Sequence, residues 1–373
     1  MRRSLALKAV LILLVAMLTA CGPQQPLKLG FISGQTGPFS DLGAAGLNGA
    51  ILAVEENNRQ PKTTHQVTLI IRDDEHNSVK ARMAFQSLMK EEVAAVVGPM
   101  TSAIATELAP LANEAQVVLM GGTVVTDQLS GQDDYFLRAI ASTRYYAAYS
   151  AGVHHQRLKP KRVLVVFDAA NRDYAENWAK TYTETLRPLG VQHAEVIEID
   201  SRSPQYSPTQ THARILQNNP DLVTFATSAR TAASLILTLR EQRRDLRFAV
   251  SAWAANRLLL EQAGGAAEGM LVEQYHDLFD SSPAYQSFAT RFRQRFNHDP
   301  DYAAVIAYDA TSLVLNGLGS NPRRAGLKEA LIAQRNFKGL QTTIELDRYG
   351  DTARTGFTTL VLNGKFAPLE RLP

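Results

Sequence analysis

The sequence lacks the residues that disulfide bonds and several kinds of enzyme chemistry require. Of its 373 residues only Cys21 is a cysteine, so the chain can form no intramolecular disulfide and no zinc site built on thiolates. It contains no GxxxxGK[ST], no GxGxxG after a strand, no HExxH and no GxSxG. Since no nucleophile–base pair is visible either, the sequence predicts neither an enzyme nor a bound cofactor or metal.

The chain also lacks a marked excess of charge of either sign. The chain has 39 basic and 36 acidic residues, and the surplus is due to Arg2, Arg3 and Lys8 near the N-terminus. If that segment is removed, the remaining chain is formally neutral and has no polybasic block, which argues against a nucleic-acid partner. The hydrophobic fraction of 45% is ordinary for a globular protein with a substantial core.

The N-terminus has the pattern of a secretory signal peptide. A basic start is followed by an apolar run over 9–17 and by small residues directly before Cys21. A transmembrane anchor is the alternative, but the run is shorter than the ~20 residues that a span needs. A small-residue site ending in cysteine resembles the bacterial lipobox. The resemblance implies a removed signal peptide (1–20), an acylated Cys21 with a tether (21–26), and an extracytoplasmic protein in the periplasm or at the cell surface, anchored to the membrane.

Beyond the tether, strand-like and helix-like segments alternate. Strands are expected at 27–33, 66–72, 93–97, 117–120, 162–167, 194–199, 222–226 and 247–250. Helices are expected at 41–57, 78–90, 102–113, 174–189, 213–217, 230–240, 287–296 and 302–318, and a surface loop at 201–210. The alternation predicts an α/β fold with parallel sheets, and the length of the chain predicts two Rossmann-like lobes.

Turns that follow strands are candidate binding sites, because ligands of open α/β sheets bind at the carboxyl ends of strands. In the turn 34–41, glycines permit a tight bend and Ser40 or Asp41 can cap the next helix. The alternative is a well-capped loop without a ligand.

Two further strand ends carry hydroxyl groups. Thr101 and Ser102 stand at an expected helix start, where free N–H groups and the helix dipole favour an anion such as a carboxylate. Thr123 follows a glycine pair after the next strand and can donate a hydrogen bond. The alternatives are an ordinary N-cap and a simple strand-to-loop transition.

Metal sites are not favoured. The acidic run 73–75 could hold Ca²⁺, but the surrounding oxygen-rich loop is missing, so a solvated acidic rim is expected. His154 and His155 are adjacent, and on a helix they diverge by ~100° and make a poor metal pair.

Five segments, taken in order, resemble one known family: LKLGFISGQTGPFSDLGAAGLNGAILAVEENN, IIRDDEHN, VAAVVGPMTSA, VLVVFDAANRDYAENWA and FNHDPDYAAVIAYDA. The chain looks like a type I periplasmic binding protein of ABC importers, of the leucine/isoleucine/valine-binding group, over nearly all of 27–373. The resemblance implies two Rossmann-like lobes joined by three crossovers, with a ligand in the cleft. Lobe one would comprise 27–143 plus 273–345, and lobe two 144–272 plus 346–373.

The resemblance also implies roles for individual residues. Thr101 and Ser102 match the pair that holds a ligand carboxylate in lobe one, and Thr123 matches a contribution from the next strand end. Tyr174, after Asp168, matches a tyrosine with which lobe two closes. An exposed aromatic at a helix start is the alternative for Tyr174.

The sequence departs from the family pattern at two positions in lobe two. Amino-acid binders of this group place an acidic residue there to meet the ligand ammonium, but this chain has Trp253 in that segment. Its ring face could offer only a cation–π contact of ~0.5–2 kcal/mol. Ser228 stands where a second tyrosine is expected. An aromatic or apolar carboxylate, or an amide, therefore fits at least as well as a branched-chain amino acid, unless Trp253 is merely a core residue near the hinge.

The resemblance thus implies a monomeric substrate-binding lipoprotein that captures a small carboxylate-bearing ligand by hinge closure and delivers it to an ABC permease. The alternative is a non-transport lipoprotein of the same fold that acts as a protein-interaction module, like the activators of peptidoglycan synthases. Gly22 keeps that alternative open, because an Asp after the acylated cysteine would retain a lipoprotein at the inner membrane of Gram-negative cells. A sensor module has no support, because no signalling domain follows.

Overall fold

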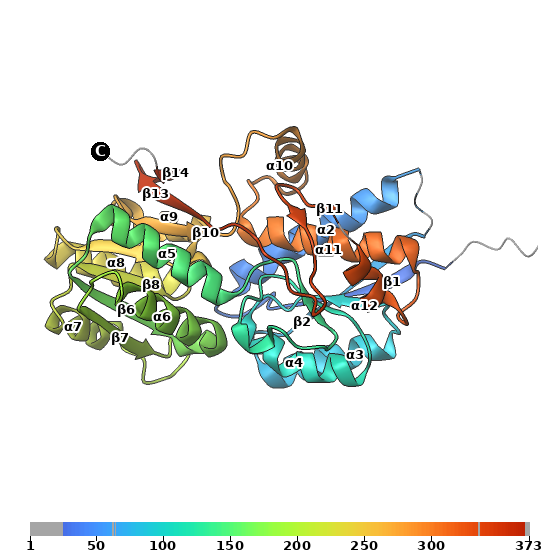
Figure 1. Ribbon diagram of the computed structural model, residues 1–373, viewed down its shortest axis with the longest axis horizontal. Coiled ribbons are helices and arrows are strands. Elements are labelled where there is room, and N and C mark those ends of the chain that lie inside the picture. Colours follow the sequence, from blue (N-terminus) through green and yellow to red (C-terminus); the bar gives the residue numbers. More distant parts are fainter. Residues whose placement is uncertain (1–24, 62, 64, 335, 370–373) are drawn as a thin grey trace, which may run out of the picture.

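The computed structural model describes residues 25–61, 63, 65–334 and 336–369, which form two α/β lobes lying side by side (Figure 1). Each lobe is built on one sheet, and a small two-stranded sheet is added to the first. The expected fold class is confirmed. The proposed signal peptide and Cys21 lie outside the described residues.

The first sheet has five strands, all parallel, in the order β2-β1-β3-β4-β5. Its strands are β1 (Leu27–Ser33), β2 (Val67–Asp73), β3 (Ala95–Val97), β4 (Leu119–Gly121) and β5 (Phe136–Arg138). The connecting helices are α2 (Ser40–Arg59), α3 (Ser78–Lys90) and α4 (Ser102–Glu114). Helices cover the sheet, so its inner strands are continuous apolar runs, such as the fully buried Ala-Val-Val of β3.

Helix α3 illustrates how the sequence specifies these elements. Ala81, Ala84, Phe85 and Leu88 recur at helical spacing and are all buried. The side chain of Asn77 caps the helix by accepting the N–H groups of residues 79 and 80. At α2 the predicted cap is wrong: the helix begins at Ser40 itself, after Phe39, without a side-chain cap.

The second sheet has seven strands in the order β14-β13-β10-β9-β8-β6-β7. They are β6 (Arg162–Asp168), β7 (His193–Ile199), β8 (Leu222–Ala226), β9 (Arg247–Val250), β10 (Leu271–Gln274), β13 (Phe357–Leu362) and β14 (Lys365–Pro368). Its helices are α5 (Thr143–Leu158), α6 (Arg172–Leu186), α7 (Pro208–Gln217), α8 (Ala229–Gln242) and α9 (Arg257–Ala263). Because α7 begins at Pro208, the loop expected at 201–210 ends three residues early.

The prediction of purely parallel sheets needs correction at one edge. Strand β13 runs antiparallel to β10 and to β14. The turn between β13 and β14 is Asn363-Gly364, with φ of 52° and 69°. Two positive φ values in an Asn-Gly pair are what a tight hairpin turn requires, and the hairpin adds an antiparallel edge to a parallel sheet.

The chain passes between the lobes three times, after β5, after β10 and before β13 (Figure 1). After the second crossing it forms α10 (Pro283–Phe296), α11 (Tyr302–Ser320), α12 (Leu327–Ala333), β11 (Phe337–Lys338) and β12 (Thr343–Ile344) beside the first sheet. The lobe boundaries expected at 143/144, 272/273 and 345/346 lie at the start of α5, inside β10 and after β12, and they stay predictions.

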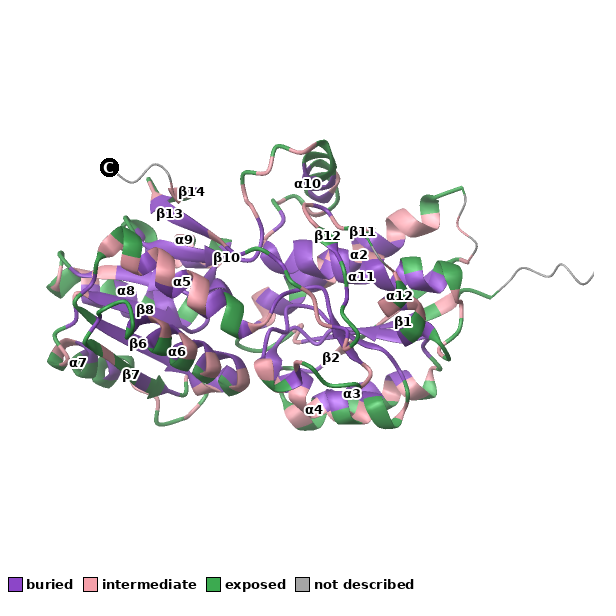
Figure 2. Ribbon diagram, in the orientation of Figure 1, coloured by how far each residue is buried: buried purple, intermediate pink, exposed green. Residues whose placement is uncertain are grey.

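Two contacts fix the returning segments against lobe one. Helices α2 and α11 pack so closely that a Cβ at Gly49 would lie 2.1 Å from the carbonyl oxygen of Ala304. In the third crossing, Arg354 forms a buried ion pair with Asp309 of α11 at 2.9 Å. Buried residues concentrate on the strands and on the inward faces of the helices (Figure 2). No helix in the described part of the chain is long and apolar enough to cross a membrane.

Candidate functional site: a polar cavity between the lobes

The start of α4 lies at the carboxyl end of β3, where lobe one faces lobe two. The turn between the two elements contains Gly98, whose φ is +100°. A Cβ at this position would lie 2.0 Å from the carbonyl oxygen of Ile32, so the close approach of the two chain segments requires glycine. This turn places Thr101 and Ser102 at the interface between the lobes.

A cavity of about 20 Å³ lies between the lobes at this point. Its lining consists of Leu42, Met100, Ser102, Thr123, Val125, Asn171, Tyr174, Trp253, Tyr275 and Tyr302. Four of the six residues predicted to bind the ligand are therefore brought together. A volume of this size has room for about one water molecule, so the lobes are closed onto each other with little free space.

The hydroxyl group of Tyr174 is the most informative polar group of the cavity. Tyr174 is only 3% exposed, and its hydroxyl makes no hydrogen bond of good geometry, although Ser251, Tyr275 and the backbone of Trp253 lie close to it. A buried hydroxyl without a partner costs about 1–3 kcal/mol, so a ligand atom that bonded to it would recover that free energy. The alternative of an exposed aromatic at the start of α6 is wrong.

Thr101 lies beside this cavity, on a second one of about 10 Å³. Its hydroxyl is 3.1 Å from Nδ1 of His76, and Nε2 of His76 is 2.8 Å from the carbonyl oxygen of Ala170 in lobe two. Because a carbonyl can only accept, Nε2 carries the proton and Nδ1 accepts from Thr101. Burial lowers the pKa of His76 to about 4, which keeps the imidazole neutral at pH 7.

Further hydrogen bonds join the lobes around the cavity. In the first turn of α4, the N–H of Ala103 donates to Oδ1 of Asn171 in lobe two at 3.1 Å. On the other side of the cleft, Nδ2 of Asn256 donates to Oδ2 of Asp41 at 2.7 Å. The side chain of Asp173 accepts from two lobe-one residues, Thr106 and Gln128. The side-chain amide oxygen of Asn171 thus lies at the helix tip where a ligand carboxylate oxygen was expected.

The walls of the cleft are aromatic. Phe39 of lobe one packs against Trp253 of lobe two with ring centroids 5.3 Å apart. Trp253 in turn meets Tyr174 edge to face at 6.0 Å, and Tyr275 meets Tyr302 in the same way at 5.4 Å. Because Trp253 is 5% exposed and lines the cavity, it is both a buried residue and a wall of the site.

No charged side chain lines the cavity. A buried acid of lobe two, Glu273, accepts hydrogen bonds from the Ser150 hydroxyl at 2.6 Å and from Trp178 Nε1 at 3.0 Å. Burial raises its pKa from 4.5 to about 7. Its carboxyl group is thus engaged within lobe two and does not offer a partner to a ligand ammonium.

The two remaining predicted hydroxyls already have partners. The hydroxyl of Thr123 donates to the carbonyl oxygen of Met100, within the cavity lining. Ser228 does not line the cavity: its Oγ accepts the N–H of Thr231 at 3.3 Å and caps α8. The role of Ser228 in ligand binding stays a prediction without support from its position.

The acidic run of residues 73–75 has a structural role. The side chain of Asp73 accepts the N–H groups of Gln35 and Glu75. Asp74 is 2% exposed, so the expectation of a solvated rim is wrong for this residue. Within the described ranges, no group of three His, Cys, Asp or Glu side chains could hold a metal ion.

Sequence reasoning missed Phe39, His76, Asn171, Tyr275 and Tyr302. The first four follow the carboxyl ends of β1, β2, β6 and β10, so the same strand-end rule that pointed to Thr101 could have found them. Tyr302 follows no strand. It starts α11, and only the packing of that helix beside α2 brings it to the cavity.

Two α/β lobes, joined by three crossings and closed around a cavity at their facing strand ends, define a two-lobed solute-binding protein. The chain belongs to the periplasmic binding protein family, whose profile matches residues 26–364. The expected family is therefore confirmed. Membership implies an extracytoplasmic protein with a small-molecule ligand and an ABC permease as partner, and the relatives are solute-binding proteins, not enzymes.

Individual relatives are distant in sequence but alike in fold. A leucine-, isoleucine-, valine-, threonine- and alanine-binding protein from Pseudomonas aeruginosa is 21% identical over 339 residues, covering 89% of this chain and 88% of its own. The branched-chain amino acid substrate-binding protein LivJ of Streptococcus pneumoniae, solved with isoleucine, superposes with a TM-score of 0.83 at 21% identity, over 92% and 98% of the two chains. A solute-binding protein from R. palustris, solved with benzoate, has a TM-score of 0.82 at 18% identity, over 92% and 96%.

Proposed function

We propose that this chain is the substrate-binding lipoprotein of an ABC importer and that it captures a small carboxylate-bearing ligand by closing its two lobes. The observation that carries the proposal is the uncharged cavity at the tip of α4. One wall of this cavity carries the hydroxyl of Ser102, and the opposite wall carries the unpartnered hydroxyl of Tyr174.

The chemistry of the cavity favours an anionic head group. The first turn of α4 presents N–H groups without partners inside the helix and the positive end of the helix dipole. Hydrogen bonds to a charged acceptor contribute about 1.5–3 kcal/mol each when water is excluded. A carboxylate oxygen that replaced Oδ1 of Asn171 would accept the N–H of Ala103 and lie on the same side as the Ser102 hydroxyl.

Within the carboxylates, an aromatic or apolar acid fits better than an α-amino acid. An ammonium group would need a carboxylate partner, and the cavity lining has none, whereas Phe39, Tyr174 and Trp253 offer ring faces and edges. The benzoate complex of the R. palustris relative supports this class. The isoleucine complex of LivJ keeps amino acids among the ligands to be tested.

Closure provides the transport mechanism. Lobe one would bind the carboxylate first, and lobe two would then add contacts from Tyr174 and Trp253 that exist only in the closed form. Those contacts shift the equilibrium toward closure, and the closed lobes are what a permease would recognise.

Anchoring through Cys21 is part of the same proposal. The full-length protein should fractionate with membranes and carry an acyl group on Cys21, which mass spectrometry of the N-terminal peptide would detect. Cys21→Ser should carry no acyl group, and a native N-terminal peptide without an acyl group on Cys21 would contradict the anchor.

The binding proposal is tested by titration calorimetry of the chain without residues 1–21 against benzoate, phenylacetate, benzamide, leucine and isoleucine, after a screen of thermal midpoints. We expect benzoate or phenylacetate to bind at least tenfold more tightly than the amino acids, and the screen to show the same order. Tighter binding of leucine would contradict the proposed ligand class, and absence of binding across the panel would contradict ligand capture.

A second function is favoured by one observation. The cavity has room for about one water, and five hydrogen bonds already join the lobes around it. A non-transport interaction lipoprotein of the same fold has no need of an open cleft. No change of thermal midpoint with any small acid, amide or amino acid would favour that function.

A further inference from the structure

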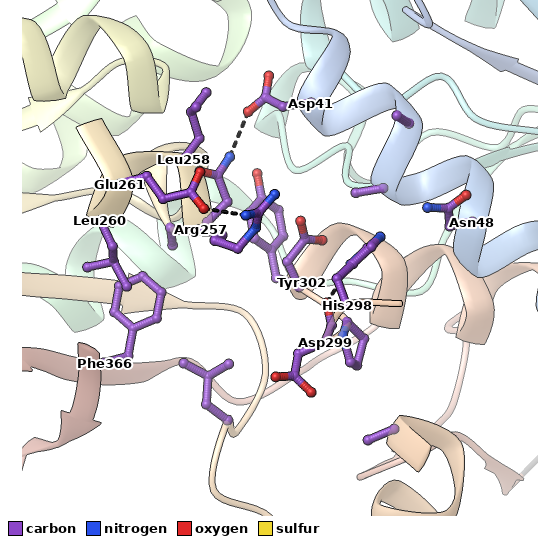
Figure 3. Close-up of a pocket in the computed structure, with 18 of the residues that line it drawn as sticks. Asp41, Asn48, Arg257, Leu258, Leu260, Glu261, His298, Asp299, Tyr302 and Phe366 are labelled. Atoms are coloured by element: carbon purple, nitrogen blue, oxygen red, sulfur yellow. Dashed lines mark hydrogen bonds and ion pairs between the residues drawn. The ribbon is translucent and has the colours of Figure 1, made fainter. Parts of the chain in front are cut away.

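A groove of about 800 Å³ lies next to the small cavity (Figure 3). One side is formed by α2, α10 and the start of α11, and the other by α9 and β14. Asp41 and Asn48 project into it from α2, while Leu258, Leu260 and Phe366 approach from lobe two. The groove therefore exists in this form only when the two lobes are together.

Tyr302 is the single residue shared by the two linings among the residues described. Its side chain is 2% exposed, and its ring rests edge to face on Tyr275 at 5.4 Å. In the close-up, Tyr302 is drawn near the middle of the view, between the labelled side chains of Arg257 and His298 (Figure 3). One aromatic ring thus separates a one-water polar cavity from a space forty times larger.

A ligand can gain room in the closed protein in two ways. Separating the lobes would break the hydrogen bonds from Ala103 to Asn171, from His76 to Ala170 and from Asn256 to Asp41. Turning the ring of Tyr302 would disturb its contact with Tyr275 and its packing in the hydrophobic core, and it would open the cavity into the groove. This second route leaves the hydrogen bonds between the lobes intact.

We propose that Tyr302 is a gate between the head-group cavity and the groove, and that the protein accepts elongated monocarboxylates whose chain runs past Tyr302 into the groove. The inference rests on the proposed function, since it assumes that a carboxylate occupies the cavity at Ser102. It adds a second subsite and a specificity-determining residue.

The lining of the groove fits an uncharged chain. Ala44, Ala45, Leu258, Leu260 and Phe366 supply apolar surface. The charged side chains Arg257 and Glu261 form an ion pair with each other, as do Arg293 and Asp299. Asp41, Arg230 and Asp301 also line the groove, so its uncharged surface is confined to the apolar residues, along which an alkyl or aryl chain would lie.

The test compares two probes, benzoate and 5-phenylpentanoate, by titration calorimetry. The native protein is expected to bind 5-phenylpentanoate at least tenfold more tightly than benzoate. Ala44→Trp fills the groove from an exposed position on α2. It should therefore weaken binding of 5-phenylpentanoate at least tenfold and change the dissociation constant of benzoate less than twofold. The matched control is Ala284→Trp, at an exposed alanine of α10 outside the groove, which should change neither value.

Variants at the gate add a kinetic measurement. Tyr302→Ala should speed association of 5-phenylpentanoate at least fivefold in stopped-flow fluorescence of Trp253, while Tyr302→Phe, which keeps the ring, should match the native rate. If Ala44→Trp leaves 5-phenylpentanoate binding unchanged, or if benzoate binds and 5-phenylpentanoate does not, the groove is not a subsite. If neither acid binds, the proposed function itself fails.

Discussion

The two lobes contribute different chemistry to the same cavity. Lobe one brings hydroxyl groups and the start of α4, through Ser102 and Thr123, together with the ring of Tyr302. Lobe two brings aromatic side chains and one amide, through Tyr174, Trp253 and Asn171. The difference indicates a division of labour, in which lobe one would hold the polar head of a ligand and lobe two would select the rest of it and sense closure.

The lobes also treat buried charge differently. In lobe one, Arg354 and Asp309 are 2% and 1% exposed and neutralise each other. In lobe two, Glu273 is fully buried and receives hydrogen bonds from neutral donors only. The ion pair fixes the third crossing to lobe one, where Arg354 opposes the rise that burial causes in the pKa of Asp309, whereas the carboxyl group of Glu273 has no cationic partner.

The largest effect is expected from breaking the ion pair. Arg354→Met leaves the carboxylate of Asp309 buried without its partner, which should lower the free energy of unfolding by about 3–5 kcal/mol in urea denaturation. Arg257→Met is the matched control, because its ion pair with Glu261 is exposed and should be worth less than about 1 kcal/mol. Equal losses in the two variants would show that burial of the pair is unimportant.

The second effect concerns Glu273 and pH. Its pKa is raised from 4.5 to about 7 by burial, so the unfolded chain loses this proton at a lower pH than the folded protein. The stabilisation of the folded state by protonated Glu273 is complete below about pH 4.5 and is lost as the pH rises through 7. The loss amounts to ~3 kcal/mol of unfolding free energy.

Glu273→Gln keeps the shape of the protonated side chain but has no proton to lose in this pH range. The native protein should therefore lose about 3 kcal/mol of unfolding free energy relative to the variant between pH 5 and pH 8, measured by urea denaturation at both values. A difference between the two proteins that does not change with pH would show that Glu273 does not titrate in this range.

A smaller effect tests the polar wall of lobe one. Ser102→Ala should weaken binding of benzoate by one to two orders of magnitude, because a charge-assisted hydrogen bond of about 1.5–3 kcal/mol is lost. Titration calorimetry measures the change, and Ser234→Ala, at an exposed serine of α8, serves as the control. An unchanged dissociation constant would remove Ser102 from the site.

The smallest effect tests the aromatic wall of lobe two. Trp253→Phe keeps a ring but, because phenyl is smaller than indole, loses part of the contact with Phe39 and Tyr174. Benzoate binding should therefore weaken twofold to tenfold, in line with ~0.5–1.5 kcal/mol for an aromatic pair. A loss larger than that of Ser102→Ala would reverse the division of labour between the lobes.

Local patterns predicted much of this molecule. The sequence from 78 to 90 predicted α3 to the residue, and the hydroxyls after β3 lie at the interface between the lobes as expected. The hairpin of β13 and β14 was missed although its Asn363-Gly364 turn is a local signal.

Other features depend on contacts between distant segments and could not be derived from local patterns. Thr101 bonds to His76, 25 residues away, and through it to lobe two. Tyr302 reaches the cavity only because α11 packs on α2. Where the chain brings two lobes together, the partners of each side chain are set by packing, so the sequence pointed to some polar residues of the cavity, such as Ser102 and Thr123, but not to what they contact.

The most direct test of the central claim is a crystal structure of the protein with benzoate. The account predicts closed lobes with the carboxylate within hydrogen-bond distance of Ser102 Oγ and of the Ala103 N–H, Oδ1 of Asn171 displaced, and the ring against Trp253. Benzoate bound elsewhere, with Asn171 still accepting from Ala103, would contradict it.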